Sequence, residues 1–332
     1  MEAREIVPGQ LAGEPYSLSG RPTAARRLSV SAPVCLDLAT LDWTARQESS
    51  MGGGGIGLAL DIRIGLEIAP ASDWNAKLPD PEPTLHLGRC LTTAVGSHEA
   101  FSISPLPGKE MPFDPTPEML SAVAAGINAS LGRPMGQREL RRLIANNAMR
   151  GEEGTLVPMV DNGTRIAGAL SGGLLIMTDG LEVACRTPLP EEGSIILVPP
   201  RAKAGPLDLG RMVQIEAKDR EKKAHEVLMR LLPAAIRSDI PKIGDSIYRL
   251  QLLGSKVAEI RRFGGGDEIY RLLSALRIKG CAVVGVHGDT GIVAAYVRNE
   301  LAHGCISLLE EIGMPSILCR PDSHGMTVQV LQ

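Results

Sequence analysis

The sequence predicts an α+β fold, because segments with the two-residue period of strands and the 3.6-residue period of helices intermix without strict βαβ alternation. The 332 residues are 44% hydrophobic and 22% charged, which is typical of a globular protein with a large core. This length accommodates two domains of ordinary size. We expect a flexible arm over residues 1–25, a first domain over 26–190 and a second over 191–332, divided near a Pro/Glu-rich segment.

In the first half of the chain the pattern predicts mostly strands. Apolar residues alternate from Ile62 to Ile68, and a hairpin turn is expected at Asn162-Gly163. Thr116 is a candidate N-cap, followed by Pro117 in the first helical position. The expected strands cover residues 28–41, 56–68, 84–103 and 155–178, and the expected helices begin at 116 and 136.

In the second half helices dominate. An apolar stripe that includes Val227, Leu228 and Leu231 predicts an amphipathic helix over 219–232, which Pro233 should end or kink. Further helices are expected over 243–258, 268–277 and 305–312, and strands over 193–199, 281–286, 292–297 and 326–331.

Composition excludes some classes of function. Aromatic residues make up 3% of the chain and the formal net charge is -3, so neither base stacking nor a basic phosphate-binding face is available for nucleic acid. The six cysteines are scattered, which favours free thiols in the cytoplasm over a zinc cage or a disulfide framework. We expect no membrane segment and no signal peptide, since no apolar run reaches about 18 residues.

Four segments carry residue types suited to binding or catalysis. Gly52–Gly55 could bring backbone N–H groups close to a phosphate, although a flexible turn has the same composition. Asp37 lies in an otherwise apolar strand, so it is either paired, metal-bound or functional, or exposed on an edge strand. His287–Gly291 can bring an imidazole and a carboxylate into one cleft, or be an ordinary hairpin turn. Arg320–Gly325 suits a carboxylate ligand, or is a solvated loop.

In their order along the chain, these segments resemble the GHMP superfamily of small-molecule kinases and their relatives. The segment 280–297 is similar to the glycine-rich third motif of that superfamily, and residues 33–37 occupy the place of its first motif. Within the superfamily the chain looks most like the β-ribofuranosylaminobenzene 5'-phosphate synthases. The residues that carry this likeness are Cys35-Leu36-Asp37-Leu38, Arg46, the run from Gly54 to Leu60, the run from His225 to Ala234, and Arg320-Pro321 with Gly325.

The resemblance covers most of residues 27–330 and has structural implications. It implies a GHMP-like architecture, with an N-terminal βαβ-type domain packed on a C-terminal ferredoxin-like α/β sandwich. It also implies a homodimer.

The chain departs from the family pattern at two places. The glycine-rich phosphate loop of the kinases is replaced by residues 112–118, which contain no glycine, so an ATP-phosphate cradle is disfavoured. A capped helix N-terminus that favours an anion remains there. The tryptophan-containing turn of the synthases is replaced by residues 287–291, which supply an imidazole and a carboxylate. The resemblance then points to the C-glycosyl synthases of C-nucleoside antibiotics of the formycin and pyrazofurin type.

The activity implied by this resemblance is decarboxylative C-ribosyl transfer. 5-Phosphoribosyl 1-diphosphate would be joined to an amino-substituted aromatic or heteroaromatic acid, with 4-amino-pyrazole-3,5-dicarboxylate as the favoured acceptor, and CO2 and pyrophosphate would be released with Mg²⁺ as the cofactor. The alternatives are the synthase reaction on 4-aminobenzoate, a GHMP-type ATP-dependent kinase of a small molecule, and a non-catalytic member that binds a metabolite or a partner.

The expected site combines three segments of the chain. We expect Asp37, His287 and Asp289 to be catalytic, with Asp37 binding the metal or orienting the acceptor. The remaining expected substrate contacts are Arg46, Gly53, Gly54, Gly55 and Thr116 for phosphates or another anion, and Thr290, Arg320, Ser323 and His324 for the acceptor.

Overall fold

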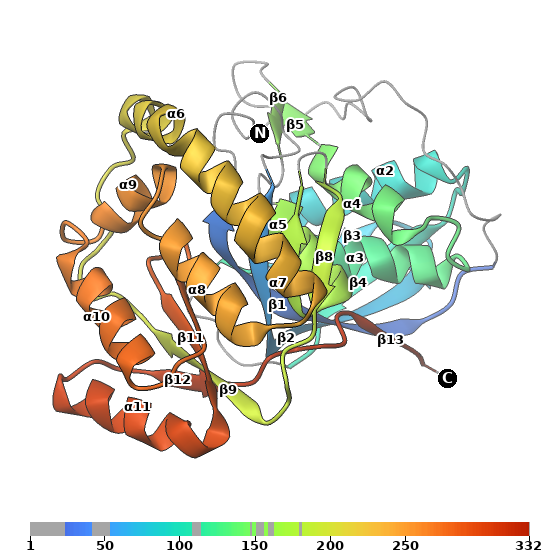
Figure 1. Cartoon of the computed structure of the whole chain (residues 1–332). Coiled ribbons are helices and arrows are strands. Elements are labelled where there is room, and N and C mark those ends of the chain that lie inside the picture. The colour runs from blue at the N-terminus through green and yellow to red at the C-terminus, as the bar shows by residue number, and fades with distance from the viewer. Residues whose placement is uncertain are drawn as a thin grey trace.

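Two antiparallel-rich sheets lie beside one another, each with helices against it (Figure 1). The computed structural model describes residues 24–41, 54–107, 114–146, 148–150, 156–158, 163–178 and 181–331. Strands and helices alternate irregularly along the chain, which confirms the predicted α+β class. Arg46, Gly53 and residues 1–23 of the expected N-terminal arm lie outside the described residues.

The larger sheet is built on the long antiparallel pair β1 (Leu28–Thr40) and β2 (Gly55–Ala71). Its strand order is β13-β1-β2-β4-β3, and β7 pairs with both β2 and β8. The last described strand therefore pairs with the first. The other strands are β3 (Asn75–Ala76), β4 (Ala100–Pro105), β7 (Leu174–Met177), β8 (Val183–Thr187) and β13 (Thr327–Val330), and a separate hairpin joins β5 (Ala148–Arg150) to β6 (Leu156–Pro158).

Two helices, α3 (Thr116–Ser130) and α5 (Gly163–Ser171), pack directly on β1 and β2. α2 (Pro81–Ala94) packs on α3, and α4 (Gln137–Asn146) contacts both α3 and α5. This helical layer buries the face of β1 that carries Cys35, which lies against Gly168 of α5, whereas the fully buried Leu38 lies against Gly285 of β10. The N-termini of α3 and α5 are thereby brought to the end of β1 that carries Asp37.

The smaller sheet has four antiparallel strands in the order β10-β11-β9-β12. Because side chains alternate along a strand, β9 contributes to two hydrophobic cores. Ile195 and Leu197 belong to the core shared with the larger sheet. Ile196 and Val198 belong to the core beneath α10 and α11. The bounds are β9 (Gly193–Val198), β10 (Val283–Val286), β11 (Val293–Arg298), β12 (Ile317–Cys319), α10 (Asp267–Ile278) and α11 (Asn299–Glu311).

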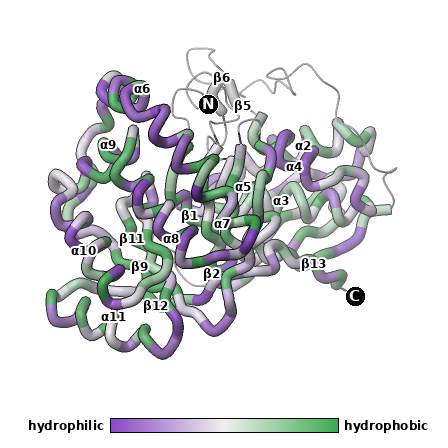
Figure 2. Tube along the Cα trace, in the orientation of Figure 1, coloured by the Kyte–Doolittle hydropathy of each residue, from purple (hydrophilic) through white to green (hydrophobic). Residues whose placement is uncertain are grey.

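A long helix, α6 (Leu209–Glu226), runs from the smaller sheet's side of the molecule toward β1 (Figure 1). It continues through a π-helical segment, η2 (Val227–Leu231), into α7 (Leu232–Ile236), and is followed by α8 (Ile240–Leu250) and α9 (Ser255–Arg261). Figure 2 shows α6 as largely hydrophilic, in contrast to the hydrophobic strands β1 and β2. Among the described residues, none of the helices combines the length and the apolar character needed to span a membrane.

Two predicted strand regions are wrong because tertiary packing selects helices. Residues 84–94 belong to α2, whose first turn holds Pro81 and whose buried residues Thr84, Leu87 and Leu91 recur at helical spacing, so only 100–105 of this region is a strand. The hairpin expected at Asn162-Gly163 is replaced by α5, which begins at Gly163. Short strands remain on each side of α5, at 156–158 and 174–177.

The second half of the chain differs from the prediction at helix ends. The helix expected to end at Pro233 continues through it to Ile236, because the π-helical turn before it changes the hydrogen-bond register and places the proline in the first turn of α7. The helix expected over 243–258 is two helices, because α8 ends at Leu250 and α9 begins only at Ser255, after Gly254 with its φ of 59°. Leu228, expected in the apolar stripe, is 61% exposed. The helix expected from residue 305 already begins at Asn299.

Candidate functional site

Asp37 lies in the interior of β1, opposite Gly57 of β2. Its exposed fraction is only 7%, so the alternative of a carboxylate facing solvent from an edge strand is wrong. Burial opposes the ionisation of a carboxylate. A carboxylate buried this deeply is therefore expected to have a partner or a functional role. The charged groups around this end of β1 therefore define the candidate site.

A buried ion pair between Glu118 and Arg165 lies beside this segment of β1. Arg165 donates from Nε to Oε1 of Glu118 at 2.9 Å and from Nη2 to Oε2 at 2.6 Å, and the backbone N–H of Cys35 donates to Oε1 at 3.1 Å. Arg165 also donates to the carbonyl oxygen of Asp114 at 2.6 Å. These bonds fasten the N-termini of α3 and α5 to β1.

The electrostatics of Arg165 connect this pair with the smaller sheet. Burial acts to lower the pKa of Arg165, but the bound Glu118 carboxylate outweighs it and, with Cys35 and Asp289, holds that pKa above its ordinary value. Asp289 belongs to the turn between β10 and β11, so this turn lies within electrostatic range of the ion pair. Burial foremost, with Glu118 and Asp37 adding to it, raises the pKa of the Cys35 thiol, which therefore stays protonated.

The turn between β10 and β11 is held by its own side chains. His287 is buried, and its Nδ1 lies 3.1 Å from Oγ1 of Thr290, which also accepts a hydrogen bond from the backbone N–H of Ile292. A Cβ atom on Gly288 would lie 2.6 Å from a carboxylate oxygen of Glu259, so a larger residue there would displace the Glu259 side chain. His287 thus stabilises the turn, and Asp289 at its tip is exposed.

Two buried lysines lie at the same junction, and the sequence analysis missed both. Lys223 of α6 donates to the carbonyl oxygen of Thr40, at the end of β1. It also forms an ion pair with Glu216, seven residues earlier on the same helix. Lys256 of α9 pairs with Glu259 at 2.9 Å, directly beside the 287–291 turn. A charged pair at i and i+7 on the buried face of α6 is the one sequence signal that could have identified Lys223.

Gln251 joins the two sheets at this point. Its Nε2 donates to the carbonyl oxygen of Leu38 in β1, and its Oε1 accepts from the backbone N–H of Val286 in β10, both at 3.1 Å. The side chain is completely buried. The strand that carries Asp37 and the strand that leads to His287 are therefore fixed relative to one another.

The glycines at the start of β2 have a packing role. A Cβ atom on Gly55 would lie 2.3 Å from Oγ1 of Thr164, and one on Gly57 would lie 2.7 Å from Cγ2 of the same residue. Gly54 has a φ of 71°, a conformation that favours glycine. The close approach of α5 to β2 thus gives a reason for these glycines that is independent of any phosphate.

Thr116 is the first residue of α3 and does not cap it. Its backbone N–H and its hydroxyl both donate to Oδ1 of Asp114, at 3.0 and 2.6 Å. The N-terminus of α3 therefore holds two carboxylates of the protein itself, Asp114 and the buried Glu118. An anionic ligand at this helix end would meet the charge of Asp114, whereas the charge of Glu118 is balanced by Arg165.

Arg320, Ser323 and His324 lie along a different edge of β2. The backbone N–H of Arg320 donates to Asp61 at 2.8 Å, the hydroxyl of Ser323 donates to a carbonyl oxygen between β8 and β9, and the exposed His324 lies 3.9 Å from a carboxylate oxygen of Glu191. Asp61 is four residues along β2 from the partner of Asp37, or ~13 Å. The loop also reaches Ala59, which accepts a hydrogen bond from the backbone N–H of Asp322 at 3.0 Å and pairs with Cys35 of β1.

The donor set at the junction fits a metal ion only in part. Within the described ranges, no group of three or more His, Cys, Asp or Glu residues could hold a metal ion. Mg²⁺ commonly takes one or two carboxylates and completes its shell with water and substrate phosphates. Asp37 and Asp289 supply that number of carboxylates, so the chain fits a magnesium ion brought in with a phosphorylated substrate.

Comparison with solved structures identifies the fold. Homoserine kinase from Cytophaga hutchinsonii superposes with a TM-score of 0.61 at 16% identity, over 92% of this chain and 98% of that one. Mevalonate diphosphate decarboxylase from Enterococcus faecalis gives 0.66 at 12% identity, over 93% and 100%. Mevalonate pyrophosphate decarboxylase from Streptococcus pyogenes gives 0.66 at 10% identity, over 94% and 99%. These proteins belong to the GHMP superfamily, so the fold expected from the resemblance is confirmed.

No family model and no curated protein sequence matches the chain.

Proposed function

We propose that this protein transfers the 5-phosphoribosyl group of 5-phosphoribosyl 1-diphosphate to a ring carbon of an amino-substituted aromatic or heteroaromatic acid. 4-Amino-pyrazole-3,5-dicarboxylate is the acceptor we favour. The observation that supports the proposal is the N-terminus of α3, where the protein's own carboxylates Asp114 and Glu118 accept hydrogen bonds from Thr116 and Arg165. The same fold with this helix end closed to phosphates favours a donor other than ATP.

The proposed reaction needs little covalent help from the protein. The bond between the anomeric carbon and the diphosphate oxygen breaks, and pyrophosphate leaves with the electron pair. The ring carbon that bears a carboxylate attacks the anomeric carbon, and the carboxylate then leaves as CO2, whose bonding electrons restore the aromatic ring. Because the sugar passes through an oxocarbenium-like state, carboxylates placed nearby stabilise it and positioning supplies much of the rate.

The residues near the end of β1 suit these tasks. We assign Asp37 to orienting the acceptor or the sugar, and Asp289 and Thr290, at the turn that His287 holds, to the acceptor pocket. Asp37 and Asp289 would hold a Mg²⁺ ion together with the substrate diphosphate, and the ion would neutralise charge on the departing pyrophosphate. Arg46 and the 53–55 backbone remain our candidates for the donor phosphates.

A GHMP-type kinase is the second candidate, because fold relatives include a homoserine kinase and a mevalonate diphosphate decarboxylase solved with an ATP analogue and magnesium. The carboxylates at the N-terminus of α3 count against it. Both candidates act on a phosphate-bearing donor, so a direct comparison of donors separates them.

The test incubates the protein with Mg²⁺, each candidate acid and either 5-phosphoribosyl 1-diphosphate or ATP, and follows the products by mass spectrometry. The proposal expects a C-nucleotide with equimolar CO2 and pyrophosphate from the first donor and no phosphorylated product from ATP. Asp37→Asn should lower turnover by at least about a hundredfold, the loss of ~2.7 kcal/mol of transition-state stabilisation. Asp73→Asn, at an exposed position, is the matched control and should leave turnover unchanged. Phosphoryl transfer from ATP would instead establish the kinase.

A further inference from the structure

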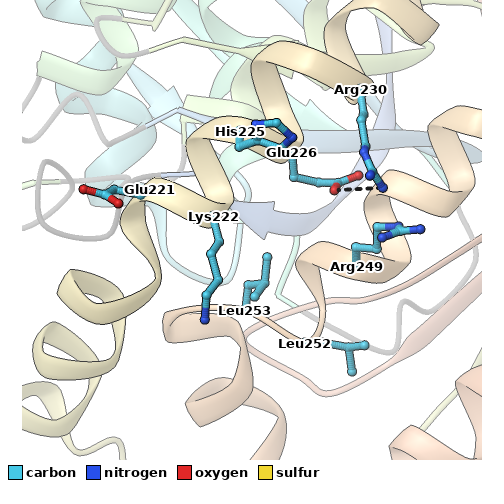
Figure 3. A pocket seen from close by; sticks show the side chains of 8 residues that line it. All are labelled: Glu221, Lys222, His225, Glu226, Arg230, Arg249, Leu252 and Leu253. Carbon is cyan, nitrogen blue, oxygen red and sulfur yellow. Dashed lines mark ion pairs between the residues drawn. The ribbon is translucent and has the colours of Figure 1, made fainter.

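A groove on the outer side of α6 and α8 has no part in the site described above. It has a volume of about 660 Å³, within the range of small-molecule sites. Its walls carry the charged side chains Lys222, Glu226, Arg230 and Arg249, and Leu252 supplies an apolar surface (Figure 3). Lys222 lines this groove, whereas the next residue, Lys223, donates to the end of β1. The groove and the candidate active site thus lie on different sides of α6.

Glu226 is the unusual residue of the groove. Only 6% of it is exposed, and among the described residues its buried Oε1 has no hydrogen-bond partner. Its Oε2 lies 3.7 Å from Nη1 of Arg230, which is an ion pair but too long for a hydrogen bond (Figure 3). A buried carboxylate oxygen without a donor is destabilising, so the groove is incomplete without a molecule that donates to it.

The groove also carries positive charge. Arg249 forms no ion pair with any described residue, and the one ion pair of Arg230 is the long one with Glu226. Lys222 is already paired with Asp219 at 3.0 Å. Two guanidinium groups with spare donors, Arg230 from η2 and Arg249 from the end of α8, suit the oxygen atoms of a phosphate.

The backbone of the groove is built from helices with one local irregularity. The π-helical segment η2 follows Glu226 and contains Arg230, and such segments occur frequently at functional sites. Leu252 is 46% exposed at the groove, so a ligand carbon skeleton can pack against it. The groove therefore combines a hydrogen-bond acceptor, an anion site and an apolar wall.

We propose that this groove binds a small phosphate ester that also carries hydroxyl or amino groups. Its phosphate binds Arg230 and Arg249, and its hydroxyl or amino groups donate to Oε1 of Glu226. A sugar phosphate has this combination, whereas inorganic phosphate lacks the carbon skeleton and a free sugar lacks the anion. The site is separate from the one that holds Asp37.

The test measures binding of ribose 5-phosphate, inorganic phosphate and ribose to the full chain by isothermal titration calorimetry. Ribose 5-phosphate should bind at least about tenfold more tightly than inorganic phosphate, and ribose should not bind. Arg249→Gln should weaken the binding of ribose 5-phosphate by at least about tenfold, because one charge-assisted hydrogen bond is lost. Glu226→Gln should reduce the preference for ribose 5-phosphate over inorganic phosphate.

Two further variants make the result decisive. Arg298→Gln, at an exposed ion pair elsewhere, is the matched control for loss of a surface arginine and should leave binding unchanged. Asp37→Asn should retain the binding that Arg249→Gln loses, because the two sites are separate. The proposal is overturned if no probe binds, if Arg249→Gln and Glu226→Gln bind like the unmodified protein, or if Asp37→Asn alone abolishes binding.

Discussion

The guanidinium of Arg165 and the carboxylate of Glu118 form a two-bond ion pair at the N-terminus of α3, with side chains that are 5% and 0% exposed. The pair joins α3 to α5 and also fixes the charge at the N-terminus of α3. The same pair therefore affects both the stability of the fold and the charge at this helix end.

Removing the charge of Glu118 should destabilise the fold strongly. Glu118→Gln leaves Arg165 buried without its counter-ion, and breaking one side of a buried pair costs about 3–5 kcal/mol. The free energy of unfolding from urea titrations measures this loss. The matched control is Glu300→Gln, which breaks an exposed pair with Arg298 and should change stability by less than about 0.5 kcal/mol. Equal losses in the two variants would contradict a special role for the buried pair.

The packing of α5 on β1 leaves no room for a methyl group at Gly168. A Cβ atom there would lie 2.1 Å from Sγ of Cys35 and 2.6 Å from its Cβ. Gly168→Ala should therefore lower the free energy of unfolding by about 1–3 kcal/mol, the usual cost of overpacking. Gly304, inside α11, has no atom within 4 Å of its missing Cβ, so Gly304→Ala should raise stability by about 0.5–1 kcal/mol. Opposite signs in thermal or urea unfolding are the expected result.

Buried thiols should make the fold sensitive to alkali. Burial raises the pKa of Cys90 from 9.0 to about 11, and burial with the nearby Asp61 carboxylate raises the pKa of Cys319 to about 12. Above about pH 9 the unfolded chain loses these protons and the folded chain keeps them, so stability falls as pH rises. Each thiol contributes ~1.4 kcal/mol per pH unit until its folded pKa is reached.

Urea unfolding at a series of pH values above about pH 8 measures this slope. Cys90→Ala should reduce the slope of the free energy of unfolding against pH by the contribution of one proton. The same substitution at the half-buried Cys185 controls for the loss of a thiol as such. A slope that Cys90→Ala leaves unchanged would rule out the assignment to that thiol.

The strands and the class of fold were predictable because their signals are local. The alternation from Ile62 to Ile68 and the short apolar runs before and after residues 287–291 have the period that strands require, and they form β2, β10 and β11. The segment around residues 84–94 was not predictable in this way. Thr84, Leu87 and Leu91 recur there at helical spacing, but Gly88 on the same buried face adds no apolar side chain, and its contact with the ring of Trp74 appears only in the structure.

The candidate site was predictable from the sequence only where a charged residue has apolar neighbours along the chain. Asp37 stands out as a carboxylate among apolar neighbours, and the structure buries it as that contrast suggested. Glu118, Arg165 and Lys223 do not stand out, because charged residues on helices ordinarily face water. Glu118 and Arg165 are 47 residues apart and Lys223 is 183 residues from Thr40, so along the chain only the seven-residue spacing of Glu216 and Lys223 gives a signal.

Gln251 should decide how firmly the two sheets are held at the site. Gln251→Leu leaves the Leu38 carbonyl and the Val286 N–H without their partner, which should lower the free energy of unfolding by about 2–4 kcal/mol. Gln251→Glu keeps the acceptor for Val286 but can donate to Leu38 only when protonated. Burial raises the pKa of such a carboxyl, so this variant should lose stability, relative to the unmodified protein, as pH rises from about 5 to about 8. Urea unfolding across that range measures the effect, and a pH-independent loss in both variants would mean that Gln251 only fills space.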